Sequence, residues 1–466
     1  MVKKNNRYRL SIVIIFFISL CCFGAEQFHA EIMLERNLEH QTYDLPVRRD
    51  FIFDPLDLLV WSRFDIVAKY IYAYYREMGF KTDWALRLYI EHQRVWGNFQ
   101  EWDGCKQCLD DFLEIFNEVI DSIKWNGFNP RISKIRIDNR KIPCEGSHRI
   151  GASLLYKNKI VCYYDSKGIP PRSTMSSSMF FRKYTKYVKD GLAEKYLDDM
   201  ALYYAKLKRN SSLVLVFPVA DGNHDEIRKI LRMYGNIVYE KYVKLTKNGQ
   251  LLFIRELYED ASWLGSWKDH FSGAQREVCE RFGSSENDGT MRIWLVEFNT
   301  SRQRISCQQT IQSLFDNNKY AVYSSKNHLE TMRLGRILFL ANSIAFLNTA
   351  EIKYVKLLDG CLSCFKKIMH KYNIDKNHAV DHLCLVDTNT CYTSFGSCDP
   401  LKLHLVSSLY AKVPVDYGSF FPFDCITTIP ADELLFNPEN HFYYKDVKLA
   451  VTPFVQKSSD FFLYSS

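Results

Sequence analysis

The spacing of apolar residues changes along the chain, and each change predicts a different kind of structure. Over residues 51–125 apolar side chains recur about every 3.6 residues, which predicts helices. From residue 132 the apolar runs become shorter. Residues 132–137 and 159–164 predict strands, and 147–156 between them predicts a helix with small residues on one face.

A longer alternation of strands and helices follows between residues 185 and 350. The expected strands are 213–219, 237–245, 291–298 and 320–323. The expected helices are 192–208, 225–233, 248–258, 302–315 and 331–346. Strands and helices in this order favour a ferredoxin-like plait with insertions.

The last part, 351–466, is rich in Cys, Phe, Tyr and Pro and predicts short strands joined by turns such as 437–440. A segment rich in Pro, Ser and Thr at 168–178 has the composition of a linker. We therefore expect a multidomain α+β protein. Its expected blocks are a helical part leading into a small α/β domain over 50–168, the plait over 185–350, and an α+β domain over 351–466.

Residues 1–24 have the pattern of a targeting segment. Residues 3–9 are basic, 11–22 are apolar, and Cys22 and Gly24 are small residues that suit cleavage after Gly24. The apolar run is shorter than the ~20 residues of a membrane-spanning helix. We expect a cleaved signal peptide and a secretory location. The alternatives are a retained single-pass anchor, with membrane contact through residues 10–24 only, and a buried helix.

The composition is that of an ordinary globular protein, with 47% hydrophobic and 25% charged residues. Only 13 Pro and 20 Gly are present, which excludes collagen-like repeats and long low-complexity tracts. The net charge is +7, and four of the basic residues lie within the first nine positions. The remaining excess is too small to predict a nucleic acid as partner.

The sequence has 14 cysteines, of which Cys21 and Cys22 lie in the expected signal segment. In an exported chain several of the others could form disulfides, but spacing alone does not give their pairing. Two Cys-x-x-Cys pairs occur, Cys105/Cys108 and Cys361/Cys364, the second within a helical pattern. Their separation is far larger than in a zinc ribbon, so we predict disulfides or buried thiols and no metal site.

The segment with the clearest chemistry is Cys144-Glu-Gly-Ser-His-Arg-Ile-Gly-Ala152, between an expected strand and an expected helix. A glycine lets the backbone approach a phosphate. Backbone N–H groups at the start of a helix attract anions. His148 and Arg149 add donors for phosphoryl oxygens. The alternative is a purely structural helix start in which Arg149 pairs with a buried acid.

These residues resemble the Asp-Gly-x-His-Arg motif of the ParB/sulfiredoxin-like superfamily, over about residues 85–165. Members bind nucleotides at this motif, and one branch is an ADP-dependent free-serine kinase. The resemblance implies ATP or another nucleotide as ligand, held by Gly146, Ser147, His148 and Arg149. It implies Glu145 and His148 as catalytic residues. Glu145 stands where the family has Asp, one methylene shorter.

The block 185–350 resembles nucleoside diphosphate kinase at Val216-Phe-Pro218, at Lys244-Leu-Thr246 and over 321–327. In that family the late strand carries a phosphorylated histidine. Tyr323 stands at the corresponding place, and without an imidazole the phosphohistidine step cannot occur. The resemblance implies a plait that has lost this chemistry, and an ordinary plait used as a scaffold is the alternative.

Residues 381–449 resemble a polymerase-β-type nucleotidyltransferase, best over 434–445. That family requires a Gly-Ser turn and an Asp-x-Asp pair that holds two metal ions. Here Asp387-Thr388 and Lys402-Leu-His404 stand at those places, so the metal-binding carboxylates are absent from the sequence. The resemblance implies a degenerate domain without nucleotidyltransferase activity.

Together these patterns predict an exported or membrane-anchored protein that binds a nucleotide or a phosphorylated small molecule. Besides binding, the resemblance implies phosphotransferase activity centred on residues 145–149. The first alternative is a non-enzymatic interaction or structural protein built from degenerate nucleotide-handling domains. The second, a glycan-modifying enzyme, rests on family association alone.

Overall fold

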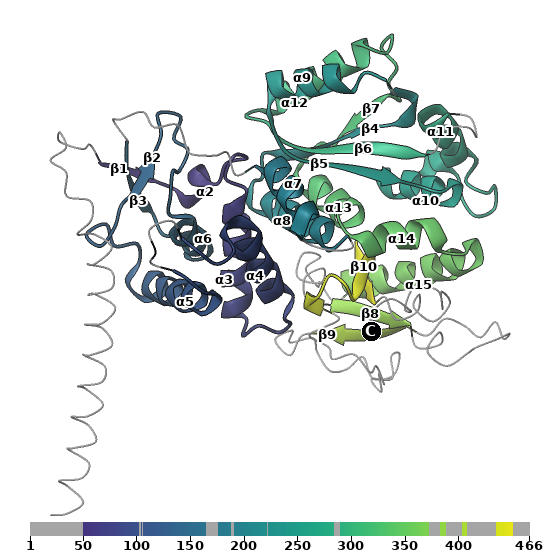
Figure 1. The fold of residues 1–466 in the computed structure, drawn as a ribbon. Coiled ribbons are helices and arrows are strands. Elements are labelled where there is room, and N and C mark those ends of the chain that lie inside the picture. The colour runs from purple at the N-terminus through teal and green to yellow at the C-terminus, as the bar shows by residue number, and fades with distance from the viewer. Residues whose placement is uncertain are drawn as a thin grey trace, which may run out of the picture. The chain divides into compact units, whose positions relative to one another are not determined.

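The computed structural model describes residues 50–101, 104, 106–164, 176–187, 191–220, 222–283, 289–371, 383–387, 403–407 and 435–450. Within these residues the chain is a mixed α+β protein with three small sheets (Figure 1). The described residues form two compact units. Unit 1 holds those up to Leu58 and from Phe99 to Ser173, and unit 2 holds the rest.

The expected targeting segment 1–24 lies outside the described residues. Among the helices that are described, none is long and apolar enough to cross a membrane.

Unit 1 is built on a three-stranded sheet with the order β1-β3-β2. β2 (Ile135–Ile137) and β3 (Ile160–Tyr164) are parallel and are connected through α6 (Ser147–Tyr156), which confirms the expected strand, helix and strand. α5 (Leu109–Asn126) packs against α6, and so does the short α2 (Pro55–Leu58). The helical expectation for 51–125 is wrong at its start. Residues Asp50–Phe53 form β1, which pairs antiparallel with β3 and shows the alternating exposure of an edge strand.

Helices α3 (Asp65–Glu77) and α4 (Trp84–Gly97) group with unit 2, although the sequence placed them in the block 50–168. They pack against each other, and α3 also packs against α8 (Leu192–Leu207). Trp84 Nε1 donates to Asp199 Oδ2 of α8 at 2.7 Å. The contacts with α8 join residues more than 100 positions apart, so helical periodicity could not reveal them.

The four-stranded sheet of unit 2 has the order β5-β6-β4-β7, and each neighbouring pair is antiparallel. Its strands are β4 (Ser211–Val216), β5 (Asn236–Lys244), β6 (Thr290–Glu297) and β7 (Val322–Ser324). The helices between them are α9 (His224–Tyr234), α10 (Lys247–Leu257), α11 (Ser272–Phe282) and α12 (Ser301–Ser313), with short 3-10 turns at Pro218–Ala220 and Ser262–Leu264. The four strands and helices α9, α10 and α12 lie within a few residues of the sequence expectation, whereas α11 and the two 3-10 turns were not predicted.

Helices cover both faces of this sheet (Figure 1). On one face Val214, Val216, Trp294 and Val296 pack with apolar residues of α9 and α12 into a core. Alternate strand residues point to opposite faces, so the other face receives the remaining apolar positions of β4 and β6. α8 and α13 (His328–Leu338) lie on that side. α7 (Ser177–Tyr187) precedes α8 in the chain and packs against it.

The expected single helix over 331–346 is divided into α13 and α14 (Ala341–Thr349), and Leu340 between them is extended. The Ser343 hydroxyl donates to the Arg336 carbonyl at 3.1 Å and accepts from Tyr443 N–H at 2.9 Å. Asn342 Nδ2 donates to the carbonyls of Glu439 at 2.9 Å and of His441 at 3.2 Å. The break therefore serves contacts with the C-terminal segment.

The C-terminal part begins with a long helix, α15 (Ile352–Lys371), where the sequence predicted mainly strands. Its Val355, Leu358, Leu362 and Phe365 are buried at helical spacing. The predicted short strands follow. They are β8 (Leu383–Asp387), β9 (Leu403–Ser407), β10 (His441–Tyr444) and β11 (Val447–Ala450), in the sheet order β10-β11-β8-β9.

Candidate functional site

The turn that carries the predicted phosphate site connects β2 to α6 in unit 1. The Cys144 N–H donates to the Arg136 carbonyl at 2.8 Å, which holds the turn beside β2. Gly146 follows as the N-cap of α6, with φ +75°. A Cβ at this position would collide with Ile135 Cδ1. The positive φ and the close approach both explain why glycine stands here.

The start of α6 presents backbone N–H groups toward the turn. The first intrahelical bond runs from the Ile150 N–H to the Gly146 carbonyl at 2.9 Å. The N–H groups of Ser147, His148 and Arg149 precede it, and the glycine N-cap has no side chain that could accept from them. This helix end follows the carboxyl end of a strand in a parallel pair, a position at which α/β units bind anions.

The guanidinium of Arg149 folds back over the same turn. Its Nη2 lies 3.2 Å from the position that a Cβ on Gly146 would take, and its Nη1 donates to the Ser133 hydroxyl. Burial lowers the pKa of the guanidinium, and the carboxylate of Glu145 opposes that shift. Arg149 is therefore half-buried beside the helix start and hydrogen-bonded to a hydroxyl. It is neither fully exposed, as an open phosphate site would have it, nor paired with a buried acid in the described part of the chain, as the structural alternative would have it.

The two predicted catalytic residues lie in different surroundings. Glu145 Oε2 lies 3.8 Å from Arg136 Nη2, and both side chains are about one-third exposed, at 35% and 34%. The His148 ring packs edge-on against Phe116 of α5, with centroids 4.6 Å apart, and lies 6.4 Å from Phe112. The imidazole of His148 therefore packs against α5, whereas Glu145, Gly146, Ser147 and Arg149 lie together at the start of α6.

Tyr323, which stands at the place of the phosphorylated histidine, lies in β7. Its hydroxyl donates to Glu330 Oε1 at 2.5 Å. Burial raises the pKa of this phenol, and the hydrogen bond to Glu330 adds to the shift. Glu330 also accepts from the Lys326 N–H at 2.5 Å. A phenol held neutral in this way offers no nucleophile for a phosphohistidine-type transfer.

The predicted nucleotidyltransferase-like positions are described in part. Asp387 ends β8 and pairs in register with Leu403 of β9, so the two segments that the resemblance brings together are neighbours. Thr388 and Lys402 lie outside the described residues. In the part of the chain that the structure describes, no three or more His, Cys, Asp and Glu side chains gather in a way that could hold a metal ion.

Five cysteines of the described segments form no disulfide. They are Cys108, Cys144, Cys162, Cys279 and Cys307, of which Cys108 and Cys279 are exposed. Cys105, the other half of the first Cys-x-x-Cys pair, lies outside the described residues. Cys361 and Cys364 follow the backbone of α15, as the helical pattern predicted.

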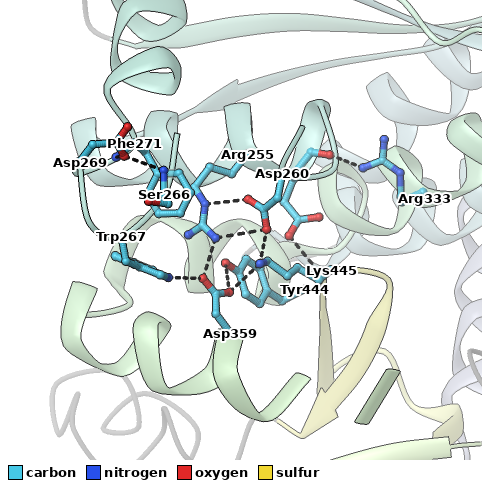
Figure 2. A network of polar contacts seen from close by, with 11 residues as sticks. Arg255, Asp260, Ser266, Trp267, Asp269, Phe271, Arg333, Asp359, Tyr444 and Lys445 are labelled. Atoms are coloured by element: carbon cyan, nitrogen blue, oxygen red, sulfur yellow. Dashed lines mark hydrogen bonds and ion pairs between the residues drawn. The ribbon is translucent and has the colours of Figure 1, made fainter. Parts of the chain in front are cut away.

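A charged network in unit 2 centres on Arg255 of α10, which the sequence did not single out (Figure 2). Its guanidinium is buried, with Nε donating to Asp260 Oδ1 at 2.9 Å and Nη2 to Asp359 Oδ2 at 2.6 Å. The face of the guanidinium lies 3.9 Å from the centroid of the Phe271 ring. The centroid of the Trp267 ring lies 4.9 Å from it as well, so two carboxylates and two aromatic rings hold this buried cation.

Asp359 of α15 collects donors from three further residues (Figure 2). Trp267 Nε1 donates at 2.9 Å, the Tyr444 hydroxyl at 3.0 Å, and Lys445 Nζ lies at 2.9 Å. Lys445 also pairs with Asp260. The acids and bases of this network balance one another, so its role is to fasten α15 and the β10–β11 turn to α10.

Comparison with known proteins gives no relative: no family model matches the chain, and no curated protein or solved structure matches it. The domain identities that the resemblances imply remain predictions.

Proposed function

We propose that the protein binds a nucleotide or another phosphorylated small molecule at the start of α6. The observation that carries this proposal is the geometry of the β2–α6 turn. Gly146 brings the backbone close to Ile135, and the N–H groups that follow it lie beside the Arg149 guanidinium. Backbone N–H groups at a helix start, the positive end of a helix dipole and a guanidinium together favour a phosphate.

The proposal retains a ParB/sulfiredoxin-like identity for this part of the chain. It is supported by the order of strand, glycine turn, helix and parallel strand around residues 144–149. The support for chemistry beyond binding is weaker, because the ring of His148 packs on Phe116. Phosphotransferase activity would depend on Glu145, and we place it second to binding, with ATP or another nucleotide as the ligand.

A non-enzymatic scaffold is the second candidate, and the middle of the chain favours it. The sheet order β5-β6-β4-β7 with antiparallel neighbours is the arrangement of a ferredoxin-like plait, which supports that assignment. Tyr323 occupies the place of the reactive histidine and is held by Glu330. For both candidates the secretory or membrane-anchored location rests on residues 1–24 of the sequence.

Calorimetric titration of the purified chain with ATP, ADP, CTP and inorganic phosphate tests the proposal. Arg149→Lys keeps the charge but loses the planar fork, and should weaken nucleotide binding by about 1.5–3 kcal/mol. Ser133→Ala is the matched control, because it frees the guanidinium from its internal hydrogen bond and keeps both charge and fork. A folded wild-type chain that binds none of these ligands at millimolar concentration would end the proposal.

A further inference from the structure

Two sequences of the type Asn-x-Ser/Thr, the acceptor motif for N-linked glycans, occur in unit 2. They are Asn210-Ser-Ser212 at the start of β4 and Asn299-Thr-Ser301 between β6 and α12. The strands β4 and β6 are antiparallel neighbours, with Ser211 opposite Glu297. The two motifs therefore lie at the same end of the sheet, where the structure gives their asparagines different surroundings.

The side-chain amide of Asn210 is part of the fold. Its Nδ2 donates to Glu297 Oε1 at 3.3 Å and to the Phe298 carbonyl at 3.2 Å. The Asn210 carbonyl accepts from the Phe298 N–H at 3.1 Å, which continues the ladder between the two strands. Ser212, the hydroxyl residue of this motif, is 7% exposed within β4. A sugar on Asn210 Nδ2 would therefore displace contacts between the start of β4 and the end of β6.

Asn299 lies on the bend between β6 and α12, and its side chain is exposed. The start of α12 is capped by the two residues Thr300 and Gln303. Thr300 Oγ1 accepts from the Gln303 N–H at 3.2 Å, and Gln303 Oε1 accepts from the Thr300 N–H at 3.1 Å. Ser301, the hydroxyl residue of this motif, is exposed as well. A glycan on Asn299 would therefore lie on the surface and leave both the sheet and the helix start intact.

We propose that Asn299 is the acceptor of an N-linked glycan and that Asn210 is not. The inference goes beyond nucleotide binding and rests only on the secretory location that residues 1–24 predict. The donor would be an oligosaccharide joined through a diphosphate to a membrane lipid. Asn299 Nδ2 forms a bond to C1 of the first sugar, the bond from C1 to the phosphate oxygen breaks, and the lipid diphosphate leaves. One amide proton passes to the solvent in this step.

Expression of the full chain in a eukaryotic secretory cell line tests the proposal, because such cells supply both the donor and the transferase. Mass spectrometry of the intact folded protein and of its glycopeptides locates the sugar. We expect one glycan, on Asn299, and an unmodified Asn210. An amidase that removes N-linked glycans should convert Asn299 to Asp and lower the mass by that of one glycan.

Three variants separate the motif from the fold. Ser301→Ala keeps Asn299 but removes the hydroxyl of its motif, and it should abolish the glycan without affecting folding, because Ser301 is exposed. Ser301→Thr retains the motif and should retain the glycan. Ser212→Ala breaks the other motif and is the matched control, which should keep the same glycan as the wild type.

Two results would overturn the proposal while the chain reaches the secretory lumen. One is a folded chain without a glycan on Asn299, and the other is a folded chain with a glycan on Asn210. A chain that keeps residues 1–24 and stays in the cytosol would overturn the inference together with the expected location. Nucleotide titration of the same preparations separates this inference from the proposed function. A chain that binds ATP but carries no glycan rejects only the inference, and a glycosylated chain that binds no nucleotide rejects only the proposed function.

Discussion

Arg255 Nη2 donates to Asp359 Oδ2 at 2.6 Å and so joins two residues that are 104 positions apart in the sequence. The bond connects α10, which lies between β5 and β6 in the chain, to α15, which opens the C-terminal part. Both groups are largely buried, with side-chain exposures of 1% and 10%. A buried cation depends strongly on its partners, because its desolvation is compensated only by close opposite charge.

Asp359→Asn should therefore destabilise unit 2 by roughly 3 kcal/mol or more, since it leaves Arg255 and Lys445 to share Asp260. Urea unfolding measures the change. Asp225→Asn is the control: its carboxylate pairs with Arg228 on the surface, is 90% exposed, and should matter little. Equal stability of the wild type and Asp359→Asn would show that the network adds nothing.

Gly146→Ala should destabilise unit 1 more than the same change at another N-cap glycine destabilises its own helix. Gly146 has φ +75°, and a Cβ there meets Ile135. Gly191, the N-cap of α8, has φ +73° and nothing within 4 Å of a Cβ. We expect a loss of about 1 kcal/mol at Gly191 and of about 2–3 kcal/mol at Gly146, where the collision adds to the backbone cost. Scanning calorimetry of the two variants compares them, and equal losses would contradict the close approach.

The buried pair of Lys69 and His92 should make stability depend on pH. Lys69 Nζ lies 2.7 Å from His92 Nε2, and the Phe180 ring packs at 4.8 Å from the imidazole. Burial lowers the pKa of His92 well below its usual range, the charge of Lys69 adds to the effect, and Asp65 opposes it. The unfolded chain therefore takes up a proton near pH 6.5 that the folded chain refuses, so stability falls as the pH drops below about 6.5.

His92→Gln keeps an acceptor for Lys69 and removes this titration. The free energy of unfolding of the wild type should fall relative to the variant by up to about 1.4 kcal/mol per pH unit below pH 6.5. The pKa values of Asp198 and Asp199, which burial raises to about 7 and about 6, act in the opposite direction and cancel in this comparison. Parallel stability profiles of the two proteins between pH 7 and pH 5 would reject the assignment.

The N-terminal segment predicts a processed protein that begins near Ala25. Intact mass spectrometry of the protein from its native host measures the start directly. A chain that keeps Met1 and sediments with membranes would favour the retained anchor instead.

Much of the secondary structure follows from the sequence, because apolar spacing is a local property that helices and strands impose on neighbouring residues. The strands of the β5-β6-β4-β7 sheet and α6 were predictable for this reason. The motif around Gly146 was also correctly placed between a strand and a helix, although its positive φ was not predicted. Even so, Asp50–Phe53 and the break at Leu340 were missed, because strand pairing in the first case and contacts of Asn342 and Ser343 in the second override the local pattern.

What only the tertiary structure decided is where polar side chains find their partners. The motif placed Arg149 and His148 side by side in sequence, but packing sends one to Ser133 and the other onto Phe116. The sequence likewise gives no sign that Asp199 accepts a hydrogen bond from Trp84. Such pairings join segments that are distant along the chain, and they form only when the helices and sheets pack together. For this reason neither residue spacing nor a local motif predicts them.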